Sequence, residues 1–87
     1  MIFMGDTMNV KDCVAYRIQQ LCKERKIRLN ELANISGVTP STVYSLMDAR
    51  RREVSVNTIK QLCDGLDITL GEFFSTVEFD SLEQDIK

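Results

Sequence analysis

The chain has 87 residues, 44% of them hydrophobic and 28% charged, a composition typical of one small soluble domain rather than a disordered segment. Its apolar runs are short and its first residues do not resemble a signal peptide, so we expect a cytoplasmic protein without a membrane span. The formal net charge of −2 hides a polarity: residues 10–60 carry ten Lys or Arg and five acids, whereas residues 61–87 carry one Lys and seven acids. This asymmetry favours a basic working surface and an acidic tail over ordinary solvated charges.

The reactive side chains argue against catalysis and against a metal site. The sequence has no histidine, and its three cysteines, Cys13, Cys22 and Cys63, form no closely spaced pair. Each cysteine falls among the apolar positions of an expected helix, which predicts a buried, reduced thiol. Because histidine is the commonest general base and no nucleophile, phosphate-loop or paired-carboxylate motif occurs, we expect no enzyme, no metal and no cofactor.

The first half of the chain predicts two helices. Apolar residues recur at three- and four-residue steps over residues 10–25, which indicates an amphipathic helix with Asn9 as its N-cap. The stretch LNELANIS, residues 29–36, predicts a short second helix with Ile35 on its inward side. Gly37 follows, where a left-handed residue commonly ends a helix.

Three further helices are expected after this glycine. Thr39 and Pro40 supply an N-cap hydroxyl and a proline at the first position of a third helix, which runs to about residue 47. A fourth helix over residues 54–66 has Ser55 as its N-cap, and its inward face holds Val56, Ile59, Leu62, Cys63 and Leu66.

A capping box of Thr69 and Glu72 predicts a short fifth helix over residues 70–75. Residues 76–87 are acidic and only weakly periodic. They form either a frayed tail or a short element that packs or pairs through Val77, Phe79 and Leu82.

Two short helices joined by a glycine-containing turn, in LNELANISGVTPSTVYSLM, match the helix-turn-helix unit. With RIQQLCKERKI before it and TIKQLCDGLDITLGEFF after it, the chain from Val14 to Phe74 resembles the lambda-repressor-like (Cro/cI, or xenobiotic-response-element type) helix-turn-helix family. The resemblance implies an all-α, compact five-helix DNA-binding domain whose third helix enters the major groove. We expect that domain at residues 9–75, between a flexible extension at 1–8 and the acidic tail at 76–87.

The third helix carries the residues expected to contact bases. With Val43 and Leu46 turned toward the core, its outer side presents hydroxyls, and recognition helices offer their N-terminal residues to base edges. The resemblance, together with this geometry, predicts base contacts from Thr39, Pro40, Ser41, Thr42, Tyr44 and Ser45. This helix has no Arg or Gln side chain that could form two hydrogen bonds to one base. We therefore expect modest sequence specificity that depends partly on DNA shape.

Basic and polar residues around this helix are expected to contact DNA phosphates. The resemblance implies this role for Arg50, Arg51 and Arg52, although a solvated loop remains an alternative for at least one of them. Arg28 and Asn30 lie at the positive N-terminal end of the second helix, and Lys60 is a weaker candidate. The family's usual Asn-Gly after the third helix is here Asp48-Ala49, so we expect a different loop and a carboxylate that repels phosphates.

The sequence therefore predicts a sequence-specific, DNA-binding transcription regulator. We expect a repressor that binds an inverted-repeat operator as a homodimer and associates with the nucleoid, without a small-molecule ligand. The candidate dimer residues are Phe74, Val77, Phe79 and Leu82. The alternative is a protein-binding module, such as an antitoxin or partner-recruiting subunit, that keeps the helix-turn-helix fold.

Overall fold

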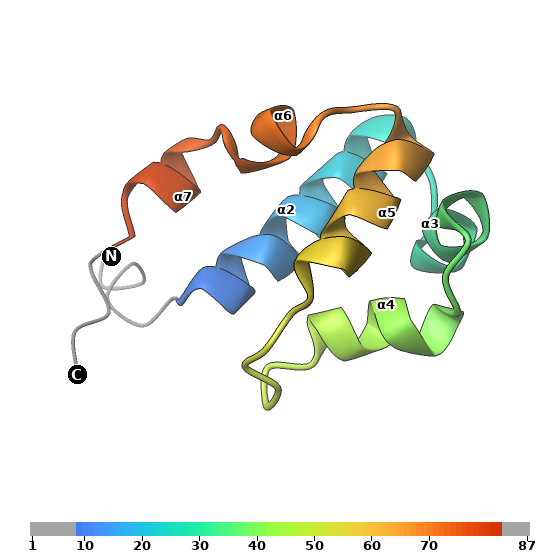
Figure 1. Cartoon of the computed structure of the whole chain (residues 1–87), viewed down its shortest axis with the longest axis horizontal. Helices are drawn as coiled ribbons and strands as arrows, with labels where there is room; N and C mark the ends of the chain where they lie inside the picture. The colour runs from blue at the N-terminus through green and yellow to red at the C-terminus, as the bar shows by residue number, and fades with distance from the viewer. Residues whose placement is uncertain (1–8, 83–87) are drawn as a thin grey trace.

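The computed structural model describes residues 9–82, which form helices and no strand (Figure 1). The helices are α2 (Val10–Arg25), α3 (Leu29–Ser36), α4 (Pro40–Met47), α5 (Val56–Leu66), α6 (Leu70–Phe74) and α7 (Val77–Asp80). The all-α prediction is confirmed, but the described residues contain six helices rather than five because a short turn of helix forms within the expected tail. The extension predicted at residues 1–8 lies outside the described residues, as do residues 83–87.

Local sequence signals fix most helix ends. The Asn9 side chain accepts from the Asp12 amide at 2.9 Å, and the Asp12 carboxylate accepts from the Asn9 amide at 3.2 Å, which completes a capping box. Thr69 and Glu72 form the same arrangement at α6, as predicted. At the end of α3, Gly37 adopts the left-handed φ of 73° that a side chain would disfavour.

The core lies between α2, α3, α4 and α5, with α3 packed against both α4 and α5, and α6 adds Phe73 to it (Figure 1). Its fully buried side chains include Ile18, Leu32, Val43, Ile59, Leu62, Leu66 and Phe73. The prediction that Ile35 and Val56 face the core is wrong: Ile35 is 53% exposed and Val56 is 67% exposed. Ile35 lies about 200° around the helix from the buried Ala33, and Val56 occupies the first position of α5, before that helix meets its neighbours.

Ser36 takes the inward place at the end of α3 and lies against Gly65 of α5. A Cβ atom on Gly65 would stand 2.9 Å from the Cα of Ser36 and 3.0 Å from the carbonyl oxygen of Ile35, both backbone atoms. The two helices therefore approach at a distance that only glycine permits. The Ser36 hydroxyl oxygen is buried there without a hydrogen-bond partner.

The two C-terminal helices lie on the side of the molecule away from α4, where α6 packs on α5 and α7 packs on α2 (Figure 1). The rings of Phe73, Phe74 and Phe79 form an aromatic cluster with centroid separations of 4.8–6.1 Å. From α2, the Arg17 guanidinium donates to the carbonyl oxygens of Glu72 and Phe73 at 2.8 Å each. Of the two alternatives for the C-terminal segment, its described part, residues 76–82, has the short element, which packs through Phe79.

The three cysteines are buried and free, as predicted, and burial raises the pKa of each thiol. Reactive cysteines are partly exposed and have a lowered pKa, so these thiols serve packing. Within residues 9–82, no helix combines the length and the apolar character needed to cross a bilayer.

Candidate nucleic-acid interface

Helix α4 forms one edge of the molecule, with the loop of residues 48–55 at its end (Figure 1). Val43 and Leu46 are buried on its inner side, at 0% and 5% exposure. As a consequence, the predicted base-contacting residues point outward: Thr39, Pro40, Ser41 and Tyr44 are exposed, and Thr42 and Ser45 are half-buried. The helix thus presents an edge of hydroxyl groups to solvent.

The hydroxyls at the start of α4 are ordered by one another. The Thr39 side chain accepts from the Thr42 amide at 3.3 Å, which is the expected N-cap contact. The same hydroxyl shares hydrogen bonds with the hydroxyls of Ser41, at 3.1 Å, and Thr42, at 2.9 Å. Since a hydroxyl has one donor and two acceptor sites, Ser41 and Thr42 keep capacity for a further partner on the exposed side.

A hydrogen bond joins a predicted base-contacting residue to a predicted phosphate-contacting one. The Tyr44 hydroxyl on α4 donates to Oδ1 of Asn30 on α3 at 2.8 Å. The amide nitrogen of Asn30 remains as a donor on the exposed start of α3. Arg28, the N-cap residue of α3, is exposed beside it, and its amide donates to the Glu31 carboxylate at 3.3 Å.

The loop after α4 carries the three predicted phosphate-binding arginines, all exposed. The Arg50 guanidinium donates to both carboxylate oxygens of Asp48, at 3.1 Å from Nε and 3.0 Å from Nη2, and Arg51 Nε lies 3.9 Å from the same carboxylate. Hydrogen bonds from Arg50 lower the pKa of Asp48 from 3.8 to about 2. The carboxylate expected to repel phosphates is therefore paired, while the side chain of Arg50 remains 90% exposed.

The backbone of this loop explains why it tolerates an alanine. Asp48 is extended, with φ −76° and ψ 111°, and Ala49 does not take a positive φ. The expected departure from a left-handed Asn-Gly loop is thus confirmed.

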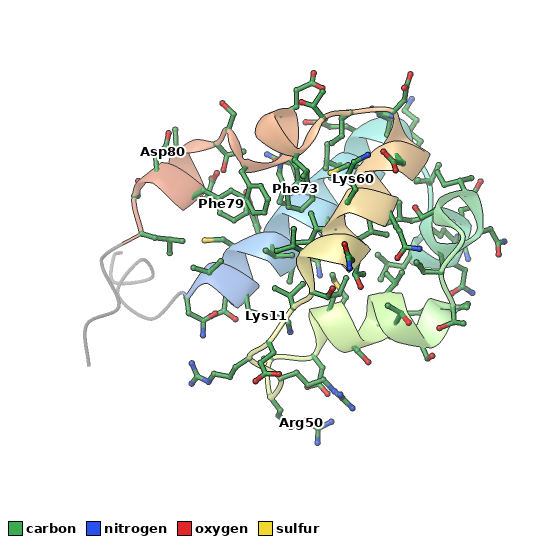
Figure 2. The ribbon with its side chains drawn as sticks, in the orientation of Figure 1. Lys11, Arg50, Lys60, Phe73, Phe79 and Asp80 are labelled. Carbon is green, nitrogen blue, oxygen red and sulfur yellow. The ribbon has the colours of Figure 1, made fainter. Side chains whose placement is uncertain are left out.

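Lys60 is the predicted site residue that the structure does not bring to this surface. It forms an ion pair with Asp64, one turn further along α5. Figure 2 shows Lys60 on the side of Phe73, away from Arg50. The other predicted residues lie along α4, at the start of α3, or in the loop of residues 48–55.

One residue at this surface was missed by the sequence analysis. Lys11, in the first turn of α2, is only 3% exposed, and its Nζ donates to the Asp48 carbonyl oxygen at 2.6 Å. In Figure 2 its side chain points from α2 toward the loop that carries Arg50. The signal was present, because Lys11 stands seven residues before Ile18 and so lies on the buried face of its helix.

Comparisons with known proteins agree with this geometry. A family model described as the Cro/C1-type HTH DNA-binding domain matches residues 17–78. Among solved structures, prophage Lp1 protein 11 superposes with a TM-score of 0.78 at 21% sequence identity, over 87% of this chain and 100% of that one. At that identity the likeness establishes a common fold. No curated protein matches the chain.

Proposed function

The chain belongs to the Cro/C1-type helix-turn-helix family of DNA-binding domains, and from that premise we propose that it is a transcriptional repressor. In this proposal it binds an inverted-repeat operator as a homodimer, with α4 in the major groove of each half-site. The observation that carries the proposal is the outward row of hydroxyls on α4, next to three exposed arginines in the following loop.

The proposed contacts divide into two kinds. Ser41, Thr42 and Ser45, with Thr39, Pro40 and Tyr44, meet base edges, and hydroxyls suit this role because they can donate or accept. The arginines at residues 50–52, together with Arg28 and Asn30, meet phosphates and set the register of the protein on the duplex. Binding takes place in the cytoplasm, on the DNA of the nucleoid.

A homodimer is proposed because one small module reads too few base pairs for useful affinity. Two copies would place their recognition helices about 34 Å apart, on half-sites one helical turn from each other. Of the four candidate dimer residues, Phe74 and Phe79 already pack within the chain, whereas Val77 is 74% exposed. Val77 is therefore the strongest candidate for a contact between copies.

Selection of bound duplexes from a random DNA pool tests the proposal directly. We expect enrichment of an inverted repeat whose half-site centres lie about 10 base pairs apart, with two chains bound per duplex. A single unrepeated site would remove the dimer from the proposal. If no sequence were enriched even at low salt, the protein-binding alternative would take its place.

A further inference from the structure

Lys11 is the only polar or charged side chain that is buried among residues 9–82, and none of the proposed DNA contacts uses it. Its ammonium lies 2.6 Å from the carbonyl oxygen of Asp48, 37 positions later in the chain. Removing an ammonium group from water is strongly unfavourable unless a good acceptor compensates it. The close contact with Asp48 supplies that acceptor and fixes the side chain in one place.

The end of α4 differs from the ends of the other long helices. α2, α3 and α5 each end at a residue in the left-handed conformation, Lys26, Gly37 and Asp67, whose amide bonds back to two carbonyl oxygens. Asp48 is extended, and its amide reaches only the carbonyl oxygen of Ser45. A cation is favourable at the negative end of a helix, and Lys11 provides one from another part of the chain.

Asp48 connects Lys11 to the arginines. Its carbonyl oxygen also accepts from the amide of Arg51 at 3.0 Å, and its carboxylate accepts from the Arg50 side chain. On the other side of the loop, Arg52 lines a shallow hollow with Asn9, Val10 and Lys11, the beginning of α2. The first turn of α2 is therefore bonded to the loop at Asp48 and lines the same hollow as Arg52.

We propose that Lys11 is a positioning residue for DNA binding: it holds the backbone at Asp48 and so orients the arginines at residues 50–52 toward the phosphates. This inference rests on the proposed function. Lys11 acts through the loop rather than by touching DNA, because its ammonium group is buried and bonded to a carbonyl oxygen.

The central test is the variant Lys11→Met, which keeps the unbranched apolar part of the side chain and removes the ammonium group. Its control is Lys60→Met, the same change in charge at an exposed site away from Arg50. On the selected operator, we expect Lys11→Met to weaken binding about tenfold and Lys60→Met to change it less than about twofold. Unchanged affinity of Lys11→Met would overturn the proposal.

The same substitution in a chain without the three arginines shows whether Lys11 acts by orienting them or through a general loss of charge or stability. In a chain that also carries Arg50→Ala, Arg51→Ala and Arg52→Ala, Lys11→Met should weaken binding by less than about twofold, because the groups it orients are gone. The same fold loss in both backgrounds would show that Lys11 acts by another route. Should Lys11→Met fail to fold, Lys11→Gln carries the same test, since its side chain is too short to reach the carbonyl.

Amide hydrogen exchange in the free protein provides a readout without DNA. The Arg51 amide, which donates to the same carbonyl oxygen as Lys11, should exchange about tenfold faster in Lys11→Met, while amides inside α5 keep their protection. Equal exchange at Arg51 would overturn the positioning role alone. Lack of duplex binding by the wild-type chain would instead overturn the proposed function.

Discussion

The hydroxyl of Tyr44 and the side-chain oxygen of Asn30 join the two helices of the helix-turn-helix by a 2.8 Å hydrogen bond on its exposed side. The bond fixes the Asn30 amide, so that its oxygen faces α4 and its nitrogen is available to a phosphate. It also limits the orientation of the Tyr44 ring, which is otherwise 50% exposed.

Tyr44→Phe keeps the ring that is proposed to meet base edges and removes only the hydroxyl that holds Asn30, so it should weaken binding to all duplexes alike. Loss of one orienting hydrogen bond is worth roughly 1 kcal/mol, or about fivefold in affinity, and the effect should nearly vanish in a chain that already carries Asn30→Ala. Tyr16→Phe, at an exposed tyrosine on α2, is the matched control. Additive losses in the double variant, measured by titration with labelled duplex, would contradict the coupling.

Arg51→Ala should reduce affinity for every sequence and make the negative slope of log affinity against log salt shallower by about one unit, because one phosphate contact is lost. Lys60→Ala should leave the slope unchanged, since Lys60 is paired with Asp64 and lies away from the loop. Titrations from low to moderate salt measure both. Equal slopes for Arg51→Ala and the wild-type chain would remove Arg51 from the interface.

Much of the fold could be predicted from interactions between residues close together in the sequence. The N-caps at Asn9, Thr39 and Thr69 and the left-handed Gly37 depend on residues within four positions of one another, and all four were predicted. The outward direction of the α4 hydroxyls followed in turn, because the helical period fixes them opposite Val43.

The errors concern contacts that periodicity does not encode. At the end of α3, either apolar Ile35 or polar Ser36 could face α5. Ser36 does, because Gly65 of α5 lies directly against its backbone. The place of Lys11 on the buried face of α2 could be read from the helical period, but its partner could not, because that partner is a backbone carbonyl oxygen 37 positions away. The bond between Tyr44 and Asn30 depends on the crossing of two helices and was likewise not predicted.

Ser41→Ala and Ser45→Ala should change which operators are preferred rather than how tightly all are bound. A lost hydroxyl contact should alter discrimination at one base pair by roughly 1 kcal/mol, while binding to unrelated duplexes stays the same. Competition among single-base variants of the selected operator measures this. A uniform loss across all variants would assign these serines to capping or solubility instead.

Gly65→Ala should destabilise the fold by about 1–3 kcal/mol, because the new methyl group would meet the backbone of α3 at Ser36. Gly71→Ala is the matched control: its methyl group would lie 3.7 Å from the Thr69 hydroxyl oxygen, an ordinary contact. That variant should be neutral or more stable by up to about 1 kcal/mol. Urea unfolding of the two variants checks the difference, and equal stabilities would mean that α3 can move away from α5.

Asp48→Asn should change the response of stability to acid. The pKa of Asp48 is about 2 in the folded chain against an ordinary 3.8, so its contribution is fully present above pH 3.8 and is lost as the pH falls toward 2. Asparagine does not titrate, so the free energy of unfolding of the variant should fall less steeply than that of the wild-type chain across this window. The difference should be small and should shrink with added salt, because the ion pair with Arg50 is open to solvent. Parallel curves for the two proteins at low salt would show that the pair with Arg50 does not persist in solution.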